Sequence, residues 1–504
     1  MMHALHSLQI LHMTDFSRAS SFLDGPPQPL VLTLKGRRES PLDLYVKIAS
    51  PSQPSFLLES GKNLNGAPCY SFIGSGPTSV IRQHLAPPDT GADPFHQLRA
   101  VIAGPQIEHT HNLPSFFGGA VGYFSYDFAR GIERLPCHAI DDLHLPDLCF
   151  ALFELVTAID HQTNHIQIIY CPSMERFLGE SREKLYREGL DRLAESETRL
   201  AGPTPRDVTL SEHDAPVFTA EQTKEAYLER VRSCQRYIAA GDIYQANLSH
   251  RFAIQLPESV RTGVGRLRYE QMLYRKLRAV NPSPFSGLLH FDDLSLVSSS
   301  PERLVRLHGR RADTRPIAGT RPRGRDPVDD HRLVDDLLGN EKERAEHLML
   351  VDLERNDLGR VCEFGSVHVD EFMAVEQYSH VSHIVSNISG RLRDDATLFD
   401  LISATFPGGT ITGVPKIRCM EIIDELEPVR RGPYTGSFGY IGWNGNLDLN
   451  IIIRTLVLAG GKGYLQVGAG IVADSDPVKE YQETLHKAQA FFSSLQGLSR
   501  CGST

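Results

Sequence analysis

Near its C-terminal end the chain runs from a strand-like segment, through two glycines, into a helix, and this order limits how the region can fold. The strand-like run Tyr464–Val467 is followed by Gly468-Ala-Gly470. Further on, Asp476 and Pro477 are typical of a helix N-cap and a first helical residue. We therefore expect a strand that leads to the glycines and a capped helix that begins at Pro477.

The two faces of this helix differ in character. Glu480, Glu483 and Lys487 fall at i, i+3 and i+7, so they share one polar face. The apolar stripe consists of Tyr481, Leu485, Ala488 and Phe492. Glu346 lies on a second predicted helix, whose start at Asn340–Glu343 resembles a capping box. Oxygen ligands from two helices, with positions open for water and substrate, suit Mg²⁺, so we expect an anionic substrate that meets this metal.

Size and charge exclude several classes of protein. The 504 residues, 41% hydrophobic and 23% charged, suffice for two or three domains or one large fold. The net charge of -10 argues against a nucleic-acid-binding protein. No apolar run is long enough to cross a bilayer, and the 8 cysteines form no Cys-x-x-Cys pair. We expect a cytoplasmic protein with reduced thiols, and neither a membrane nor a nucleic acid as partner.

The first part of the chain is rich in strand-like runs, and a polar linker separates it from the rest. Runs such as Leu30–Leu34 and Phe150–Val156 are separated by Pro/Gly turns. The Pro-containing stretch from about 201 to 216 predicts a linker between one domain at 15–200 and a second at 217–497. After the linker we expect a helix from about 221 to 240, capped by Thr219 and ended by Gly241, and then a strand over 243–254.

Two glycine-rich segments imitate nucleotide-binding motifs without meeting their requirements. In residues 468–473 the glycines do not open a helix directly, as a dinucleotide fingerprint requires. In residues 406–416 a Val-Pro pair separates Gly413 from Lys416 and breaks the Gly-Lys-Ser/Thr of a P-loop. Both segments still offer free backbone N–H groups, and Thr410 adds a hydroxyl. We expect them to bind a carboxylate or another anion, and no nucleotide.

Two polar residues lie in apolar surroundings. Arg454 falls in the strand-like run Leu449–Thr455, where an unpaired guanidinium would be costly to bury. Either a structural salt bridge or a bound anion would satisfy it, and the sequence leaves both open. His383, in Val381–Val385, is by itself most simply a core histidine. Together with the glycine segments and the carboxylates, these residues predict an enzyme that holds a metal-bound anion in a polar cleft.

Longer motifs extend through both halves of the chain. They are Phe56-Leu-Leu-Glu-Ser60, Tyr70-Ser-Phe-Ile-Gly74, Ser300-Pro-Glu-Arg303, Pro316-Ile-Ala-Gly-Thr320 and Val351-Asp-Leu-Glu-Arg-Asn-Asp-Leu-Gly359. These motifs resemble those of the chorismate-utilising enzymes, the family of anthranilate synthase component I, aminodeoxychorismate synthase component I and isochorismate synthases. The resemblance covers nearly everything from Gly241 to Lys487. It implies an α+β fold, a large two-layer α/β sandwich in which two β-sheets face one another and helices flank them.

The resemblance also implies roles for individual residues. Glu302 matches the general acid that protonates the departing C4 hydroxyl, a role worth roughly 10² to 10⁴ in rate. His383 and Thr410 match residues that line the ring. The residues that match the binding groups for the enolpyruvyl carboxylate are Tyr434, Arg454, Lys487 and the backbone of Gly468 and Gly470. The residues that match the Mg²⁺ ligands are Glu346 and Glu483, with Glu480 beside them.

Gln245 bears on whether the nucleophile is water or ammonia. In the isochorismate and salicylate branch of the family, this strand carries a lysine that activates water, and an uncharged amide cannot serve as that base. The resemblance therefore favours ammonia over water. Because the chain has no glutaminase signature, the ammonia is expected to come from a separate glutamine amidotransferase subunit.

Local motifs separate the two aminating branches of the family. Those that resemble the aminodeoxychorismate enzymes are 244–249, 281–287, 406–413 and 434–441. Ala318 favours the other branch, because well-known aminodeoxychorismate synthases have a lysine there that attacks C2, whereas anthranilate synthases have alanine. The stretch 378–387 also resembles the anthranilate branch. We expect amination of chorismate to 4-amino-4-deoxychorismate, with formation of anthranilate and pyruvate as the alternative.

A second ligand site is also suggested by the resemblance. The residues that resemble the two sides of the tryptophan pocket of anthranilate synthases are Ser60, Asn281, Pro282 and Phe285. Ser286-Gly287 replaces the bulky pair expected there, so the packing should differ. A nicotinamide enzyme would require the rejected fingerprint. A noncatalytic tryptophan-binding homologue would be expected to lose Glu302, Glu346 or Glu483, and all three are present.

Overall fold

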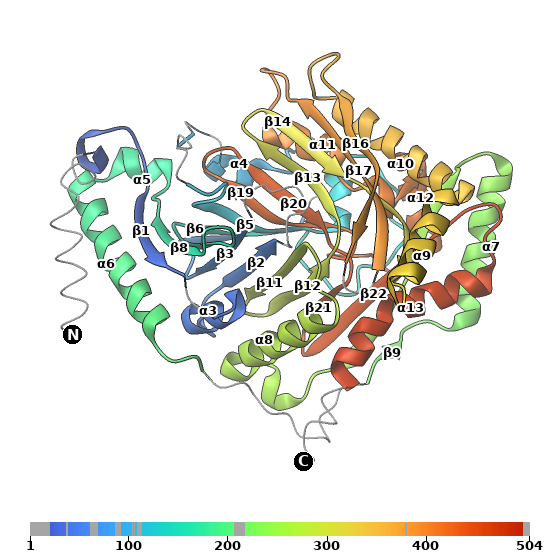
Figure 1. The fold of residues 1–504 in the computed structure, drawn as a ribbon, viewed down its shortest axis with the longest axis horizontal. Helices are drawn as coiled ribbons and strands as arrows, with labels where there is room; N and C mark the ends of the chain where they lie inside the picture. Colours follow the sequence, from blue (N-terminus) through green and yellow to red (C-terminus); the bar gives the residue numbers. More distant parts are fainter. Residues whose placement is uncertain are drawn as a thin grey trace.

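Two antiparallel β-sheets form the body of the molecule, with helices around them (Figure 1). The structure is a computed structural model that describes residues 21–36, 39–60, 69–85, 92–102, 104, 106–107, 113–205, 217–378 and 381–496. Within these residues sheet A has 12 strands and sheet B has 10. The expected two-sheet α/β sandwich is confirmed.

Sheet A places strands from both halves of the chain side by side. In spatial order its strands are β1 (Leu30–Lys35), β8 (His165–Tyr170), β7 (Leu155–Asp160), β3 (Tyr70–Ser75), β2 (Ser55–Ser60), β11 (Phe285–Phe291), β12 (Leu294–Ser300), β21 (Thr455–Ala459), β22 (Lys462–Ile471), β10 (Gln245–Gln255) and β18 (Gly413–Val414), with β9 (Thr219–Ala220) also paired to β10.

Sheet B mixes the two halves in the same way. In spatial order its strands are β15 (Ile317–Pro322), β17 (Val381–Arg391), β14 (Arg311–Arg315), β13 (Arg303–His308), β20 (Leu447–Ile451), β19 (Ser437–Gly442), β5 (Gly119–Phe124), β6 (Leu148–Phe153) and β4 (Ser79–Gln83), with β16 (His368–Gln377) also paired to β17. Strand β2 pairs with β11 in sheet A, and β5 pairs with β19 in sheet B. The regions expected as two domains therefore share both sheets.

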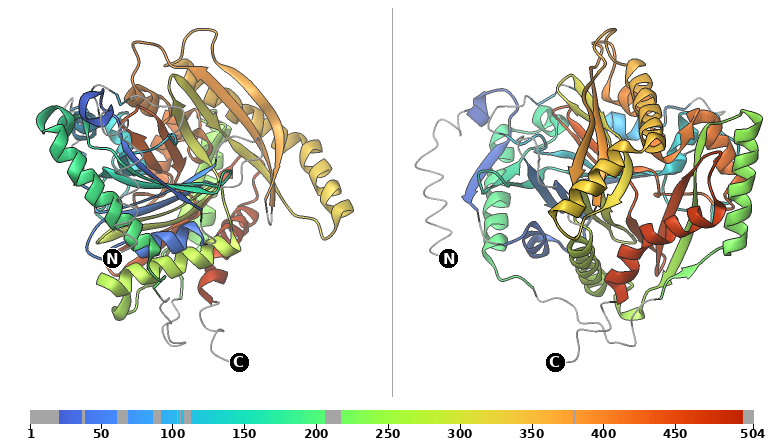
Figure 2. Two further views of the ribbon diagram at one scale, coloured as in Figure 1. Left: turned by 60° about the vertical axis from the view of Figure 1, so that its left-hand side comes forward. Right: turned by 45° about the vertical axis from the view of Figure 1, so that its right-hand side comes forward.

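The helices pack on the sheets in two groups. Those in contact with sheet A are α3 (Pro41–Ile48), α6 (Arg182–Ala201), α7 (Lys224–Ala240), α8 (Gly263–Val280), α12 (Lys416–Leu426) and α13 (Pro477–Gln496). Those in contact with sheet B are α9 (Pro327–Gly339), α10 (Glu341–Gly359) and α11 (Leu398–Thr405). The shorter helices are α4 (His96–Ile102), α5 (Met174–Gly179), η2 (Tyr126–Gly131), η4 (Glu258–Val260) and η5 (Gly409–Ile411). Figure 2 shows α9 and α10 beside β16 and β17, with α13 on the neighbouring part of the molecule.

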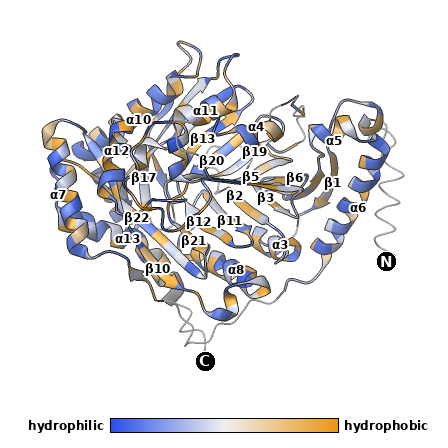
Figure 3. Cartoon of the chain, turned by 180° about the vertical axis from the view of Figure 1, so that it is seen from behind, coloured by the Kyte–Doolittle hydropathy of each residue, from blue (hydrophilic) through white to orange (hydrophobic). Residues whose placement is uncertain are grey.

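The core lies between the sheets and contains many aromatic side chains. The rings of Phe56 on β2 and Phe153 on β6 are 4.7 Å apart, and those of Phe72 on β3 and Tyr440 on β19 are 5.7 Å apart. All four side chains are buried. Such pairs add to the hydrophobic burial that holds the two sheets together. In Figure 3 the outer helices α6 and α7 are largely hydrophilic, as expected for elements with one face in water.

Several local predictions can be compared with the structure. Gly241 ends α7 in the left-handed conformation, with a φ of 84°, as expected. The predicted cap was wrong, because Thr219 belongs to β9 and the side chain of Thr223 caps α7 instead. Asn340 caps α10 through Glu343 N–H, whereas the Glu343 carboxylate pairs with Arg321, so only half of the expected capping box forms.

The remaining expectations concern the last helix and the ends of the expected domains. Asp476 accepts hydrogen bonds from the N–H groups of Val478 and Lys479, as the expected cap requires. The linker expected at 201–216 lies mostly outside the described residues, as does the expected start at residue 15. In the part of the chain that the structure covers, no helix combines the length and apolar character needed to cross a membrane.

Candidate active site

Glu302 and Arg454 lie where the chain passes from one sheet to the other. Glu302 connects β12 of sheet A to β13 of sheet B, and Arg454 lies between β20 of sheet B and β21 of sheet A. The crossings run side by side, since Ile451 N–H donates to the Glu302 carbonyl at 3.0 Å and Ser299 N–H donates to the Arg454 carbonyl at 3.1 Å. Placing both functional groups at adjacent crossings brings them together between the sheets.

The structure around Arg454 bears on two predictions, the strand over 449–455 and the choice between a structural salt bridge and a bound anion. The strand expected over 449–455 was wrong at its end, because β20 stops at Ile451 and Arg454 has a left-handed φ of 50°, which is uncommon outside glycine. Burial lowers the pKa of the guanidinium, and the nearby Glu302 opposes this effect. Among the described residues no ion pair joins Arg454 to a carboxylate, and Glu302 acts on it only through its charge. The alternative of a bound anion is therefore favoured over a structural salt bridge.

The carboxyl of Glu302 is held in a state suited to proton donation. The side chain is only 5% exposed, and burial raises its pKa to about 7. The Thr410 hydroxyl, the Ile317 N–H at 3.4 Å and the charges of Arg454 and Lys487 act in the opposite direction. A carboxyl with a pKa near neutrality can both keep and release a proton at physiological pH, as a general acid must.

His383 lies on β17 with one ring nitrogen occupied. Its Nδ1 is 2.9 Å from the Thr320 hydroxyl, and its Nε2 has no partner among the described residues. Burial, followed by the charge of Arg454, lowers the pKa of His383 to about 4, so the ring is neutral at physiological pH. A structural role in the core therefore explains the contact of Nδ1 but not the buried Nε2, which has no partner in the described part of the chain.

The two glycines predicted to bind an anion lie inside a strand. The expectation that the strand stops before them was wrong, because β22 continues through Gly468 and Gly470 to Ile471, opposite β10. A Cβ on Gly468 would lie 2.5 Å from Asn247 Oδ1 and 2.9 Å from Tyr434 Oη, and a Cβ on Gly470 would lie 2.5 Å from Gln245 Nε2. Glycine is required here because the amide and phenol side chains occupy the space above the strand.

Polar atoms without partners converge on the same region. Gln245 Oε1, Asn247 Oδ1 and His383 Nε2 are buried and have no hydrogen-bond partner among the described residues. Buried polar atoms in folded proteins almost always have a partner, so these three indicate a polar ligand. Asn247 was not singled out from the sequence. Its position two residues after Gln245 places both on one face of β10, and this alternation was the available signal.

Helix α13 brings its polar face to the same strand. Lys487 Nζ donates to the Gly468 carbonyl at 2.9 Å and pairs with Glu483 at 2.8 Å. The i, i+4 spacing seen in the sequence therefore places the lysine beside the glycines. Thr410, in η5 of the segment 406–416, lies beside the Glu302 carboxyl, whose pKa its hydroxyl lowers. Lys416 of that segment bonds Asp357 at 2.6 Å, a structural use that agrees with the rejected P-loop.

The predicted metal ligands lie on α10 and α13. Burial raises the pKa values of Glu346 and Glu480. The charge of Glu480 raises that of Glu346 further and the charge of Glu483 raises that of Glu480, while Lys342 lowers both. This mutual repulsion is the electrostatic condition that a divalent cation relieves. Within the described ranges, no three His, Cys, Asp or Glu side chains are grouped closely enough to hold a metal ion. The donor chemistry suits Mg²⁺, and ligation would require the carboxylates to move closer together.

Two of the four residues that resemble a tryptophan pocket line a cavity of about 1010 Å³ between the sheets. Ser60 and Phe285 are cross-strand partners, and both line it. Asn281 and Pro282 precede this wall at the end of α8, where the Asn281 carbonyl accepts a hydrogen bond from Ser299. Two residues that line the cavity, Pro301 and Ile317, are neighbours of Glu302. Pro301 precedes Glu302 in the sequence, and the Ile317 N–H donates a hydrogen bond to its carboxylate.

We expect that tryptophan does not inhibit this protein. A Cβ on Gly287 would lie 2.7 Å from the Phe438 ring. Ser286-Gly287 thus replaces the bulky pair that the resemblance predicts, and this wall of the cavity packs differently. Initial rates measured with increasing tryptophan should therefore stay constant into the millimolar range. Inhibition at submillimolar tryptophan would contradict this expectation and would favour the anthranilate branch.

The chain is similar to known proteins over most of its length. Residues 53–493 match the family model described as chorismate binding enzyme. Anthranilate synthase component 1 of Thermus thermophilus is 43% identical, over 93% of this chain and 98% of its own length. Aminodeoxychorismate synthase component 1 of Bacillus subtilis is 41% identical, over 91% of this chain and 95% of its own length. The crystal structure of anthranilate synthase component I from Streptococcus pneumoniae superposes with a TM-score of 0.72 at 34% identity, covering 86% of this chain and 93% of that one.

Proposed function

The chain belongs to the family of chorismate binding enzymes, and from that premise we propose that it aminates chorismate at C4 to give 4-amino-4-deoxychorismate. The observation that carries the proposal is the buried Glu302 carboxyl, with a pKa of about 7, beside the guanidinium of Arg454, which has no ion-pair partner in the described part of the chain. One group can protonate a departing hydroxyl while the other holds a carboxylate of the same substrate.

The residues around Glu302 and Arg454 would bind the rest of the substrate and the nucleophile. Arg454, Lys487, Tyr434 and the glycine backbone of β22 would bind the enolpyruvyl carboxylate. His383, neutral at physiological pH, would face the ring. Gln245 carries no base that could activate water, but its free Oε1 can accept a hydrogen bond from ammonia. This favours ammonia as the nucleophile.

A separate subunit would supply the ammonia. The relatives named above are each designated component 1, which supports a second component in their assemblies and, by inference, in this one. That component would be a glutamine amidotransferase. A purified chain that works with ammonium salts but not with glutamine is the expected behaviour.

Mg²⁺ is proposed as the cofactor. Glu346 and Glu483 would hold it, with Glu480 beside them. Once bound, the ion would draw electrons from the ring carboxylate and so ease departure of the hydroxyl at C4. The acidic side chains themselves keep the ring carboxylate away unless a cation is present, because like charges repel.

Changing Glu346 or Glu483 to Gln should remove most of the activity while leaving the fold intact, because each change deletes a charged oxygen ligand of a hard cation. The measurement is the rate of chorismate consumption against Mg²⁺ concentration, with circular dichroism to check the fold. Glu341→Gln, on an exposed turn of α10, is the matched control. Full turnover by either variant, or by the wild type in excess EDTA, would contradict the metal assignment.

Ala318 bears on how the amination could proceed. It lies on β15 opposite Ile384, next to His383, and has no nucleophile for attack on C2. We propose that ammonia attacks C2 while Glu302 protonates the C4 hydroxyl, which leaves as water. A second ammonia then forms the bond to C4, and the C2 amine departs as ammonia. Rapid-quench analysis should show a transient 2-amino isomer, and Ala318→Lys should suppress it if the lysine performs the first attack.

Anthranilate synthesis is the second candidate, and Ala318 is the observation that favours it. In that reaction the 2-amino intermediate loses pyruvate instead of accepting a second ammonia. Product analysis with chorismate, Mg²⁺ and ammonium distinguishes the two. Accumulation of 4-amino-4-deoxychorismate would support the proposal, and accumulation of anthranilate and pyruvate would overturn it in favour of this alternative.

A further inference from the structure

A buried arginine outside the predicted site uses its full hydrogen-bonding capacity. Arg431 is 2% exposed and forms a bidentate pair with Glu427, at 2.9 Å from Nε and 2.7 Å from Nη2. Nη2 also donates to the Asn247 carbonyl at 2.6 Å, and Nη1 donates to the Ile411 carbonyl at 3.0 Å and the Thr435 hydroxyl at 3.2 Å. These five bonds match the five N–H donors of a guanidinium, which no other side chain offers in this planar arrangement.

The acceptors belong to elements that carry the candidate active site. Asn247 follows Gln245 on β10, Ile411 follows Thr410 in η5, and Thr435 follows Tyr434. The guanidinium also lies 5.7 Å from the centre of the Tyr434 ring. One cation therefore connects three segments that are far apart in sequence and that each present a group to the proposed substrate.

Glu427 extends the connection to a fourth element. Its Oε1 accepts hydrogen bonds from the N–H of Ser249 at 2.8 Å and from the Ser249 hydroxyl at 2.9 Å. Ser249 lies opposite Gly468 in the β10–β22 register, and its hydroxyl also receives a hydrogen bond from Gln466 of β22 at 2.8 Å. The strand that carries both glycines is thus held to the same ion pair.

The geometry of the turn after α12 shows why such a connection is needed. Thr435 has a φ of 60°, a conformation that is costly for a β-branched residue. Strained backbone persists only where the surroundings hold it in place. Here the Arg431 bond to the Thr435 hydroxyl, together with the Thr435 N–H bond to the Ile452 carbonyl at 2.8 Å, holds the turn that presents Tyr434.

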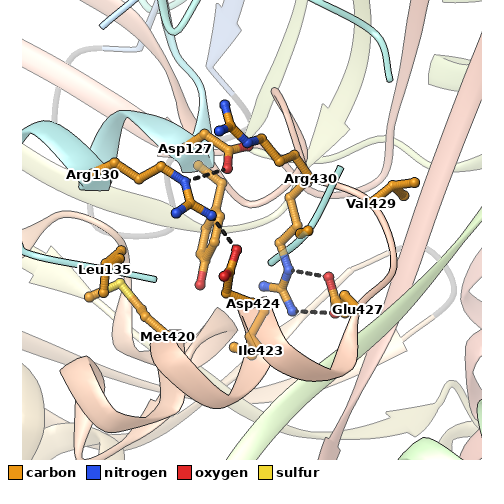
Figure 4. Close-up of a pocket in the computed structure, with 12 residues that line it drawn as sticks. Asp127, Arg130, Leu135, Met420, Ile423, Asp424, Glu427, Val429 and Arg430 are labelled. Carbon is orange, nitrogen blue, oxygen red and sulfur yellow. Dashed lines mark hydrogen bonds and ion pairs between the residues drawn. The ribbon is translucent and has the colours of Figure 1, made fainter. Parts of the chain in front are cut away.

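A second buried ion pair one turn earlier on α12 provides a contrast (Figure 4). Arg130 pairs with Asp424 and, at 3.3 Å, with Asp127, and Asp424 also accepts a hydrogen bond from the His138 N–H at 2.7 Å. These partners join α12 to η2 and the segment after it. Asp127 also accepts a hydrogen bond from the Gly432 N–H at 2.9 Å, so this pair touches the turn after α12 through Asp127. Among the described residues the Asp424 carboxylate bonds only Arg130 and the His138 N–H, and none of β10, η5 and β22.

We propose that the Arg431–Glu427 ion pair is a positioning device for the substrate site, which sets the mutual placement of β10, η5, the Tyr434 turn and β22. The inference rests on the proposed function, because it concerns how that substrate is held. Arg431 touches no substrate atom in this account and acts through the groups it orders.

The test compares Arg431→Lys with Asp424→Asn. Lysine keeps the charge but has three donors instead of five and no planar fork, so the site elements should shift relative to one another. A displacement of about 1 Å costs roughly 10²-fold in catalytic efficiency, and we therefore expect a fall of that order in kcat/KM for chorismate, mainly through a raised KM. Asp424→Asn should lower the melting temperature and leave kcat/KM unchanged. Both are assayed well below their melting temperatures.

Thr435→Ala and Thr435→Ser give a second, milder comparison if Arg431→Lys does not fold. The alanine variant removes one acceptor of the guanidinium and should raise KM, and the serine variant should restore it. Equal effects of Arg431→Lys and Asp424→Asn on kcat/KM, or identical kinetics for the two Thr435 variants, would overturn the inference while the wild type still consumes chorismate. Failure of the wild type to bind chorismate would overturn the proposed function itself.

Discussion

Replacing Glu302 by Gln is expected to lower kcat by roughly 10² to 10⁴, the contribution of a general acid placed at a departing group. The amide keeps the size of the side chain and can accept a hydrogen bond from the Ile317 N–H, but its own N–H groups are too weakly acidic to protonate a departing hydroxyl. The pH profile supplies a second measurement. Burial raises the pKa of Glu302 to about 7, so kcat/KM of the wild type should fall as the pH rises through that value and the carboxyl loses its proton. In Glu302→Gln this limb should be absent.

Glu59→Gln is a suitable control for this experiment. Glu59 is also a buried glutamate whose pKa is raised by burial, and it accepts a hydrogen bond from Tyr274 at 2.8 Å on the wall of the cavity that Ser60 and Phe285 line. The control should change stability and leave the pH limb in place. If Glu302→Gln kept the wild-type kcat and the same fall near neutral pH, Glu302 would not be the acid.

Replacing Arg454 by Ala should weaken chorismate binding by roughly 2 to 5 kcal/mol, equivalent to about 30- to 4,000-fold in Kd, if the guanidinium pairs with a desolvated carboxylate. Both residues are L-amino acids with a Cβ, so the cost of the left-handed backbone at this position is similar before and after the change. Calorimetric titration with chorismate measures the affinity, and a thermal melt measures stability.

Arg130→Ala is the matched control for Arg454. Arg130 is a largely buried arginine whose carboxylate partners, Asp127 and Asp424, contact none of the proposed substrate-binding side chains, and Asp127 reaches the Tyr434 turn only through the Gly432 N–H. Its loss should lower the melting temperature without changing the affinity for chorismate. The same result for Arg454→Ala, a lower melting point with unchanged affinity, would show that Arg454 is structural and that the anion binds elsewhere.

Both predictions concern residues, Glu302 and Arg454, that the sequence motifs identified. The sequence did not predict what surrounds either side chain. Glu302 was identified through its resemblance to a known acid, and its burial, which raises the pKa, is visible only in the fold. Arg454 was expected inside a strand. Its place at a crossing between the sheets accounts for the left-handed backbone, because β20 ends at Ile451 and the chain turns before β21 begins at Thr455.

Local features of this protein follow from sequence alone because they depend on residues a few positions apart. The start of α13 at Pro477, the left-handed end of α7 at Gly241 and the pairing of Lys487 with Glu483 are of this kind. Helix periodicity and cap chemistry act within one or two turns, so the linear order of residues is enough to predict them.

Contacts between distant segments were decided only by the tertiary structure. The Asn247 side chain faces Gly468 because β10 and β22 pair in one register, and a shift of one residue would turn it to the other face. Arg431 forms its five bonds because β10, η5 and the turn after α12 meet at one point. Sheet register and the meeting of remote segments depend on the packing of the whole chain, so residue types and spacings named most of the candidate site, and the fold alone determined how its parts are held together.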